Sequence, residues 1–155
     1  MKYRYIFVDL DNTLLDFEAA EEYSFYYTAR SRGLSFGEAE LERYKAINAP
    51  LWKMMERREI TKDALVVRRF RELFDALGIT GIDPEQYNAD YLNNLSLCTR
   101  TIDGAGELCR YIHENGVLII ATNGVSATQH RRIAASGLEP WLDKIVVSDD
   151  AGAEK

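Results

Sequence analysis

The sequence predicts an α/β fold, in which a parallel sheet core is interrupted after its first strand by a long all-helical insertion. Short apolar runs with the composition of buried strands recur along the chain, and each is followed directly by polar residues. These runs are residues 5–8, 117–121 and 144–147. Residues 16–98 show only helical patterns. We therefore predict a core formed by residues 1–15 and 99–155, with residues 16–98 as the inserted unit.

The first strand, Tyr5–Val8, has no alternation of apolar and polar residues, which predicts a strand buried on both faces. Within the insertion, Ser35 and Glu38 form a capping box in front of a long helix. We expect this helix to break at Asn48-Ala49-Pro50, because the residue before a proline avoids the α region. Thr61 then caps a further helix that ends before Gly78.

After Cys98 the pattern changes to strands and helices joined by short loops. A helix over about 105–114 leads into the strand 117–121, and a second helix over about 126–136 leads into the strand 144–147. This alternation is typical of right-handed parallel units. The second strand is followed at once by Thr122-Asn123-Gly124.

Composition limits the partners of the chain. With 46% apolar and 28% charged residues among 155, it has the make-up of a globular protein. The net charge of −6, without a basic cluster, argues against nucleic acid, and no stretch approaches the roughly 20 apolar residues of a membrane span. Cys98 and Cys109 form no metal-ligand pattern, so we expect a reduced, cytoplasmic setting.

Asp9 and Asp11 follow the first strand, at the sheet edge where open α/β folds bind ligands. Two carboxylates this close repel each other unless a cation or a chemical task holds them there. The pair suits phosphoryl transfer, with Asp9 as nucleophile and Asp11 as the acid and base for leaving group and water. Mg²⁺ beside Asp9, with the Asp11 backbone carbonyl as a second ligand, would screen its charge. A capped turn without catalytic role accounts for the same residues.

Thr122-Asn123-Gly124 occupies the equivalent place after the second strand. If the two strands are neighbours, they lie ~5 Å apart. The Thr122 hydroxyl and the following N–H groups, helped by the amino terminus of the next helix, could then hold phosphoryl oxygens. By itself the segment is more typical of a helix cap with a flexible glycine.

With these motifs, the whole chain resembles the haloacid dehalogenase (HAD) superfamily of phosphohydrolases. Asp9-Leu-Asp11-Asn-Thr13 matches its first motif, Thr122-Asn-Gly its second, and the segment from Ser148 to Lys155 its third. The helical block matches the C1-type cap, and the core would be a Rossmann-like, HAD-type sheet. By this resemblance Asp9 is nucleophile and metal ligand, Asp11 is the acid and base, and Lys155 neutralises the charge of Asp9 and the phosphoryl group. Thr13, Thr122, Asn123 and Gly124 are the remaining phosphate-binding candidates.

The stretch Asn48-Ala-Pro-Leu-Trp52, with Glu59-Ile-Thr61, also resembles the cap of the pyrimidine 5′-nucleotidase-like members. The resemblance thus implies a Mg²⁺-dependent phosphatase of a small phosphorylated metabolite, with nucleoside 5′-monophosphates as one such class. Asp11 argues against dehalogenation, because a halide leaves without a proton. A phosphomutase and a truncated, non-catalytic module are the alternatives.

The chain departs from the family at its end, where the fourth motif, an acidic pair that completes the Mg²⁺ site, is absent. Asp149 and Asp150 are poor substitutes, because they are expected two strands from Asp9, ~10 Å away. Without later strands the first strand becomes a sheet edge, with unpaired backbone groups. We therefore expect either a fragment of a longer protein or self-association through the edge of the first strand.

Two smaller sets of side chains have ordinary explanations. His113 and His130 are expected on the surface of helices rather than as ligands. Arg68, Arg69 and Arg71 are expected on a solvated helix face.

Overall fold

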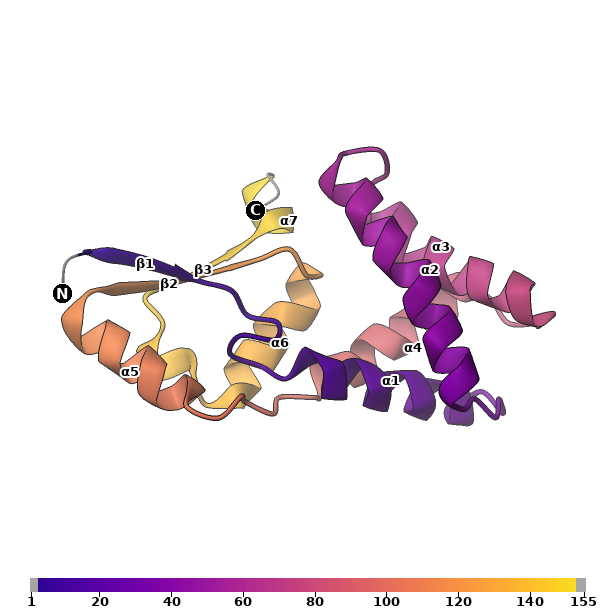
Figure 1. Ribbon diagram of the computed structural model, residues 1–155, viewed down its shortest axis with the longest axis horizontal. Helices are drawn as coiled ribbons and strands as arrows, with labels where there is room; N and C mark the ends of the chain where they lie inside the picture. The colour runs from indigo at the N-terminus through magenta and orange to yellow at the C-terminus, as the bar shows by residue number, and fades with distance from the viewer. Residues whose placement is uncertain (1–2, 153–155) are drawn as a thin grey trace. The chain divides into compact units, whose positions relative to one another are not determined.

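In the computed structural model, which describes residues 3–152, the chain divides into two compact units. Residues Glu22–Asn94 form the helical unit, and the described residues on either side of it form the sheet unit. Figure 1 shows the elements of both. The sequence places the insertion at 16–98, so the compact helical unit is a few residues shorter at each end.

The sheet unit is built on strands β1 (Tyr5–Val8), β2 (Val117–Thr122) and β3 (Lys144–Val147). The described strands are parallel and lie in the order β1-β2-β3, with Val8 paired to Ile120 and Thr122 paired to Val147. The predicted fold class, a parallel sheet with a helical insertion after the first strand, is confirmed. As expected, β1 and β2 are neighbours and β1 lies at the edge of the described sheet.

One face of the sheet is covered by α5 (Ala105–Asn115) and α6 (Ser126–Ser136), which lie on the same side of the strands in Figure 1. The short elements η1 (Glu139–Trp141) and α7 (Ser148–Ala151) complete the unit. The core beneath this face is aliphatic and is made of Leu10, Leu14, Leu15, Ala105, Cys109, Ile112, Leu118, Ile120, Ile133 and Leu138.

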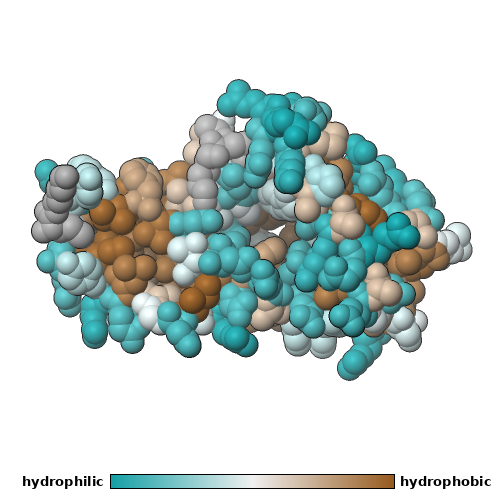
Figure 2. All heavy atoms as spheres, in the orientation of Figure 1, coloured by the Kyte–Doolittle hydropathy of each residue, from teal (hydrophilic) through white to brown (hydrophobic). Residues whose placement is uncertain are grey.

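The other face of β1 is bare, so the expectation that this strand is buried on both faces is wrong. Tyr5 is 56% exposed and Phe7 66% exposed, whereas Ile6 and Val8 pack against the core. The reason is geometric: side chains alternate across a strand, and helices of the described chain cover only one face of this sheet. Figure 2 shows the resulting hydrophobic surface at the left of the view, over the strands.

The helical unit contains α2 (Glu38–Glu56) and α3 (Lys62–Leu77), together with most of α1 (Phe17–Ser31) and α4 (Pro84–Ser96). Its core is aromatic, with ring centroids 4.8 Å apart for Phe70 and Tyr87 and 5.1 Å apart for Phe25 and Tyr44. None of the helices among the described residues is both long enough and apolar enough to span a membrane.

Two local expectations in α2 are wrong. The helix runs through Pro50 without a break, although proline removes one backbone hydrogen bond. Residues before and after the proline, including Tyr44 and Leu51, are buried along the helix, so packing outweighs the local preference. The capping box is also displaced: Gly37 is the N-cap, and its N–H donates to Glu40 Oε2 at 2.7 Å.

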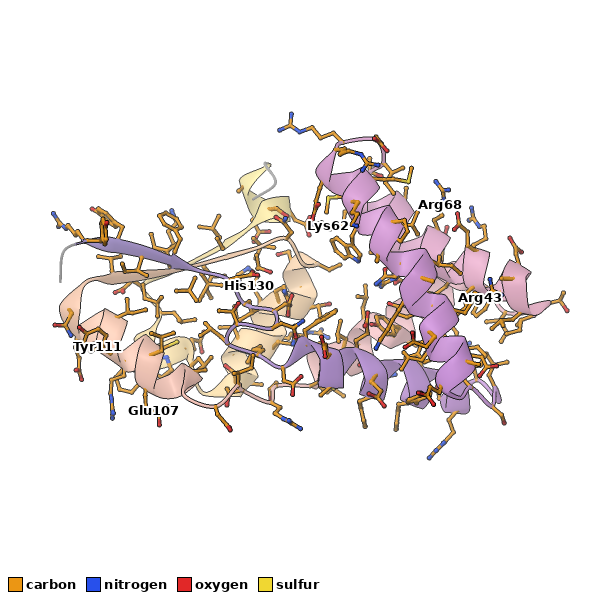
Figure 3. All side chains as sticks on the ribbon, in the orientation of Figure 1. Arg43, Lys62, Arg68, Glu107, Tyr111 and His130 are labelled. Carbon is orange, nitrogen blue, oxygen red and sulfur yellow. The ribbon has the colours of Figure 1, made fainter. Side chains whose placement is uncertain are left out.

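The helix α3 begins and ends as predicted. Thr61 Oγ1 accepts the N–H of Ala64 at 3.3 Å, and Gly78 ends the helix in the left-handed region at φ 65°. On its outer side Arg68 pairs with Glu72, as expected for a solvated face (Figure 3). Arg69 departs from the prediction, because its side chain is buried among aromatic rings of the helical unit.

Candidate active site

Asp9 stands directly after β1, where the chain turns away from the sheet. Its Oδ1 accepts the N–H of Leu10 at 2.9 Å, and the residue is half-buried. Leu10, Leu14 and Leu15 on either side of the turn are fully buried, so the core anchors this loop. The Asp9 carboxylate is thereby held at the carboxyl end of the strand.

Asp11 is held by two side chains of α6. Its Oδ1 accepts from Arg132 Nη1 at 2.5 Å, and its Oδ2 accepts from Gln129 Nε2 at 2.7 Å. The Arg132 side chain is 0% exposed and that of Asp11 is 26% exposed, so the pair is largely shielded from solvent. Charge-assisted hydrogen bonds in such surroundings are stronger than those between neutral groups.

Thr122 ends β2 and is 2% exposed. Its Oγ1 accepts from Gln129 Nε2 at 2.9 Å and from the N–H of Gly124 at 3.3 Å. One amide nitrogen therefore joins the Asp11 carboxylate to the Thr122 hydroxyl. Asp11, after β1, and Thr122, the last residue of β2, are thus brought together in the sheet unit.

The remaining predicted site residues are Thr13, Asn123 and Lys155. Thr13 is exposed in the turn after β1, and Asn123 is half-buried after β2; their binding of phosphate stays a prediction. Between the aspartates and Thr13, Asn12 adopts φ 56° and caps α1, its Oδ1 accepting the N–H groups of Phe17 and Glu18 at 3.0 and 3.2 Å. Lys155 lies outside the described residues.

The amino terminus of α6 has a protein partner. The N–H of Ser126 donates to Asp149 Oδ2 at 3.0 Å, and Ser126 Oγ donates to Asp150 Oδ1 at 2.8 Å. These hydrogen bonds join the first residue of α6 to α7, which follows β3 next to β2. That the start of α6 helps to hold phosphoryl oxygens stays a prediction. His130, on the exposed side of α6, contacts Asp150 at 3.0 Å and behaves as the expected surface residue (Figure 3).

The donor atoms for a metal are few but of suitable kind. Within residues 3–152, no group of three or more His, Cys, Asp or Glu side chains is arranged to hold a metal ion. The Asp9 carboxylate and the Asp11 backbone carbonyl are hard oxygens, and Mg²⁺ commonly binds through one or two carboxylates with water and substrate phosphate in the other positions. These two oxygens therefore fit Mg²⁺ and would supply some of its ligands.

Gln129 and Arg132 are the site residues that sequence reasoning missed. They lie 118 and 121 residues beyond Asp11 in the chain, so no local motif joins them to it. A signal was available in the helix period: Gln129, Arg132 and Ile133 share one face of a helix that starts just after Thr122. Gln129 and Arg132 are polar residues on the face that packs on the sheet, where polar side chains need hydrogen-bond partners, and this pattern could have marked them.

Known proteins resemble this chain over its whole length. A family model described as haloacid dehalogenase-like hydrolase matches residues 3–155. The protein YfnB of Bacillus subtilis (strain 168), named as a HAD-hydrolase, is 34% identical over 154 residues, which are 99% of this chain and 65% of YfnB. A crystal structure of YfnB bound to magnesium has a TM-score of 0.91 and is matched over 100% of this chain and 68% of that one.

Two further relatives are named as pyrimidine 5′-nucleotidases. PynA of Streptococcus pneumoniae (strain ATCC BAA-255 / R6) is 34% identical over 100% of this chain and 65% of PynA. YjjG of Escherichia coli (strain K12) is 30% identical over 100% of this chain and 67% of YjjG. The chain thus spans about two thirds of the length of these relatives. The resemblance noted in the sequence, including that to pyrimidine 5′-nucleotidase-like proteins, is confirmed.

Proposed function

Because the chain belongs to the haloacid dehalogenase-like hydrolase family, we propose that it forms the catalytic part of a Mg²⁺-dependent phosphatase of small phosphate monoesters, acting through a phosphorylated Asp9. The observation that carries the proposal is the shared Gln129 Nε2, which joins the proton-handling Asp11 to the phosphate-binding Thr122. A phosphate ester needs both groups at one place, next to a nucleophile. Asp9, two residues before Asp11 at the same strand end, supplies that nucleophile.

The proposed reaction has two steps. An Asp9 carboxylate oxygen forms a bond to phosphorus while the ester P–O bond breaks, and the leaving alkoxide takes a proton from Asp11. Water then gives a proton to Asp11 while its oxygen bonds to phosphorus, and the bond between phosphorus and the Asp9 oxygen breaks, which releases inorganic phosphate and restores both aspartates. Both Asp11 oxygens accept hydrogen bonds in the present arrangement, which suits the step that activates water.

Bound Mg²⁺ would offset the negative charge that Asp9 and the phosphoryl oxygens bring together. Asp9 and the Asp11 backbone carbonyl are the groups of this chain that would hold it. Thr122 would donate its hydroxyl hydrogen to a phosphoryl oxygen, with the N–H groups of Asn123 and Gly124 beside it.

Nucleoside 5′-monophosphates are the substrate class that the relatives favour. PynA and YjjG are named for pyrimidine 5′-nucleotidase activity and are 34% and 30% identical to this chain. The helical unit is inserted in the sequence after the first strand, and we propose that it acts as a cap that selects among substrates and excludes water. We propose the same class for this protein.

The test is Asp9→Asn in the complete protein, assayed with Mg²⁺ for phosphate release from a panel that includes pyrimidine and purine nucleoside 5′-monophosphates. The amide is a poor nucleophile, so turnover should fall by several orders of magnitude on every substrate. Mass spectrometry of acid-quenched enzyme should find a phosphoryl adduct on Asp9 in the parent and none in the variant.

The matched control is Asp16→Asn. Asp16 Oδ1 accepts the N–H of Ala19 at 3.0 Å at the start of α1, and asparagine serves this capping role equally well. This variant should keep the parental turnover. Retained turnover in Asp9→Asn would end the proposal.

A further inference from the structure

The Gln129 side chain is held in one orientation by its partners. Its Nε2 donates to Asp11 Oδ2 at 2.7 Å and to Thr122 Oγ1 at 2.9 Å, while its Oε1 accepts from Arg132 Nη1 at 3.1 Å. Turning the amide over would set its oxygen against the Asp11 carboxylate and its nitrogen against the guanidinium. Both contacts would be repulsive, so the network itself fixes which end is the donor.

This orientation determines what the Thr122 hydroxyl can do. A hydroxyl has one hydrogen to donate and two lone pairs that accept. Both accepting positions of Thr122 Oγ1 are used, by Gln129 Nε2 and by the N–H of Gly124. No acceptor for the hydroxyl hydrogen is found within residues 3–152. The hydrogen is therefore available to an incoming acceptor, and a phosphoryl oxygen is an acceptor of that kind.

Gly124 shows that the chain makes room for this side chain. A Cβ atom built on Gly124 would lie 2.5 Å from Gln129 Cδ and 2.7 Å from Gln129 Cγ, well inside van der Waals contact. The backbone at Gly124 does not need positive φ, so a side chain at this position would be opposed by Gln129, whose amide would have to move away. The second motif and α6 are thus fitted to each other.

Arg132 holds the other end of the network. Its Nη1 contacts both Asp11 and Gln129, and its Nε donates to the carbonyl oxygen of Cys98 at 3.1 Å. Its Nη2 is buried and lacks a hydrogen-bond partner in the described part of the chain, which costs free energy. Arg132 Nη1 thereby holds one Asp11 oxygen and the Gln129 amide oxygen next to each other.

We propose that Gln129 is a positioning residue, which directs the Thr122 hydroxyl hydrogen at the phosphoryl group and holds one Asp11 oxygen in place, with Arg132 fixing its amide. The inference rests on the proposed function and assigns to α6 a part in it. Gln129 makes no covalent bond and transfers no proton. It acts through Thr122 in phosphate binding and through Asp11 at the leaving group.

The first experiment compares Gln129→Met with Gln129→Glu in the complete protein, with Arg131→Met as control because Arg131 is exposed on the same helix. Methionine keeps the length of the side chain and removes the amide, while glutamate keeps its shape and replaces the donor by a charged acceptor. Calorimetry with inorganic phosphate should show binding about tenfold weaker in both variants, since one strong hydrogen bond is misdirected. Arg131→Met should bind phosphate as the parent does.

Kinetics on two esters separate positioning from general damage. Uridine 5′-monophosphate has an alkoxide leaving group that needs a proton, whereas 4-nitrophenolate leaves without one. For Gln129→Met, kcat should fall about tenfold further on the nucleotide than on 4-nitrophenyl phosphate. Equal losses on the two esters with unchanged phosphate binding would overturn the proposal, because they would indicate a purely structural role.

A double-mutant cycle tests the contact itself. Gly124→Ala should weaken phosphate binding about tenfold in the presence of Gln129, because the new methyl group displaces the amide. In a Gln129→Ala background the methyl group has room, and the same change should add nothing. A loss of equal size in both backgrounds would overturn the proposal. Phosphate binding needs no turnover, so these results stand apart from Asp9→Asn, on which the proposed function depends.

Discussion

Among residues 3–152, each unit buries one arginine, and the two positive charges are stabilised in different ways. In the helical unit Arg69 is 3% exposed and donates to neutral acceptors, Asn88 Oδ1 at 2.9 Å and Tyr44 Oη at 3.2 Å. Its guanidinium carbon lies 5.0 Å from the Phe70 ring centroid and 4.8 Å from that of Tyr91. In the sheet unit Arg132 is fully buried and is paired with a carboxylate, that of Asp11.

The comparison separates a buried charge that serves only packing from one that is paired with a residue of the candidate site. Rings and neutral dipoles are enough to hold Arg69 inside an aromatic core, as cation–π contacts and hydrogen bonds to a cation allow. Arg132 instead offsets the charge of Asp11 at the carboxyl end of β1, where we propose that the reaction takes place. The partner of the arginine, more than its burial, marks the site.

Replacing each arginine by methionine gives the largest expected effect. Arg132→Met leaves the Asp11 carboxylate shielded and unpaired, and should lower the free energy of unfolding of the sheet unit by about 3 kcal/mol. Arg69→Met removes a buried charge and leaves only neutral acceptors without their donor, so the helical unit should lose less, about 1 kcal/mol. Both changes keep the side-chain volume similar.

The two tryptophans of this chain allow each unit to be followed separately. Trp52 lies in α2 and Trp141 in η1, so variants that retain one tryptophan report urea unfolding of one unit by fluorescence. Asp11→Asn combined with Arg132→Met serves as the control and should recover part of the loss, because no carboxylate is left unpaired. Equal losses for the two arginines would contradict the comparison.

Tyr87 provides a smaller effect of opposite sign in the helical unit. Its hydroxyl is buried and has no hydrogen-bond partner among the described residues, although its ring packs against Phe70 and Phe74. Tyr87→Phe should therefore raise the free energy of unfolding of this unit by about 1 kcal/mol, since it removes an unpaired polar group and keeps the ring contacts. A destabilised variant in the Trp52 fluorescence assay would show that the hydroxyl has a partner.

The smallest expected effect is a loss of stability at alkaline pH, which should begin at a lower pH in the sheet unit than in the helical unit. Burial raises the pKa of the Cys109 thiol and also raises the pKa of the Tyr87 hydroxyl. Above the unfolded-state value, about 8.5 for cysteine and about 10 for tyrosine, the unfolded chain loses a proton that the folded chain keeps. Stability then falls as pH rises, first in the unit that contains Cys109 and later in the unit that contains Tyr87.

Urea unfolding at a series of alkaline pH values, read from Trp141 and from Trp52, measures the two onsets. Cys109→Ala should move the onset in the sheet unit to higher pH, and Tyr87→Phe should do the same in the helical unit. An unchanged onset in both variants would mean that other groups cause the alkaline loss.

Much of the fold follows from local patterns. The strand at 144–147 and the helix at 126–136 have the bounds that the sequence predicts, because turn residues and apolar runs mark their ends. The continuous helix through Pro50 is different, since its stability comes from residues far along the chain that pack on both sides of the proline. The bare face of β1 is likewise decided by which elements of the chain cover the sheet, and apolar composition alone does not reveal that.

The sequence by itself determined the order of strands and helices and the polar residues at the ends of β1 and β2, because periodicity, caps and turns act over a few residues. Only the tertiary structure decided that Gln129 and Arg132 reach Asp11, that Arg69 enters an aromatic core and that α7 is hydrogen-bonded to the start of α6. These contacts join segments of the chain that packing alone brings together. The local sequence of one segment does not show where a segment distant in the chain will lie.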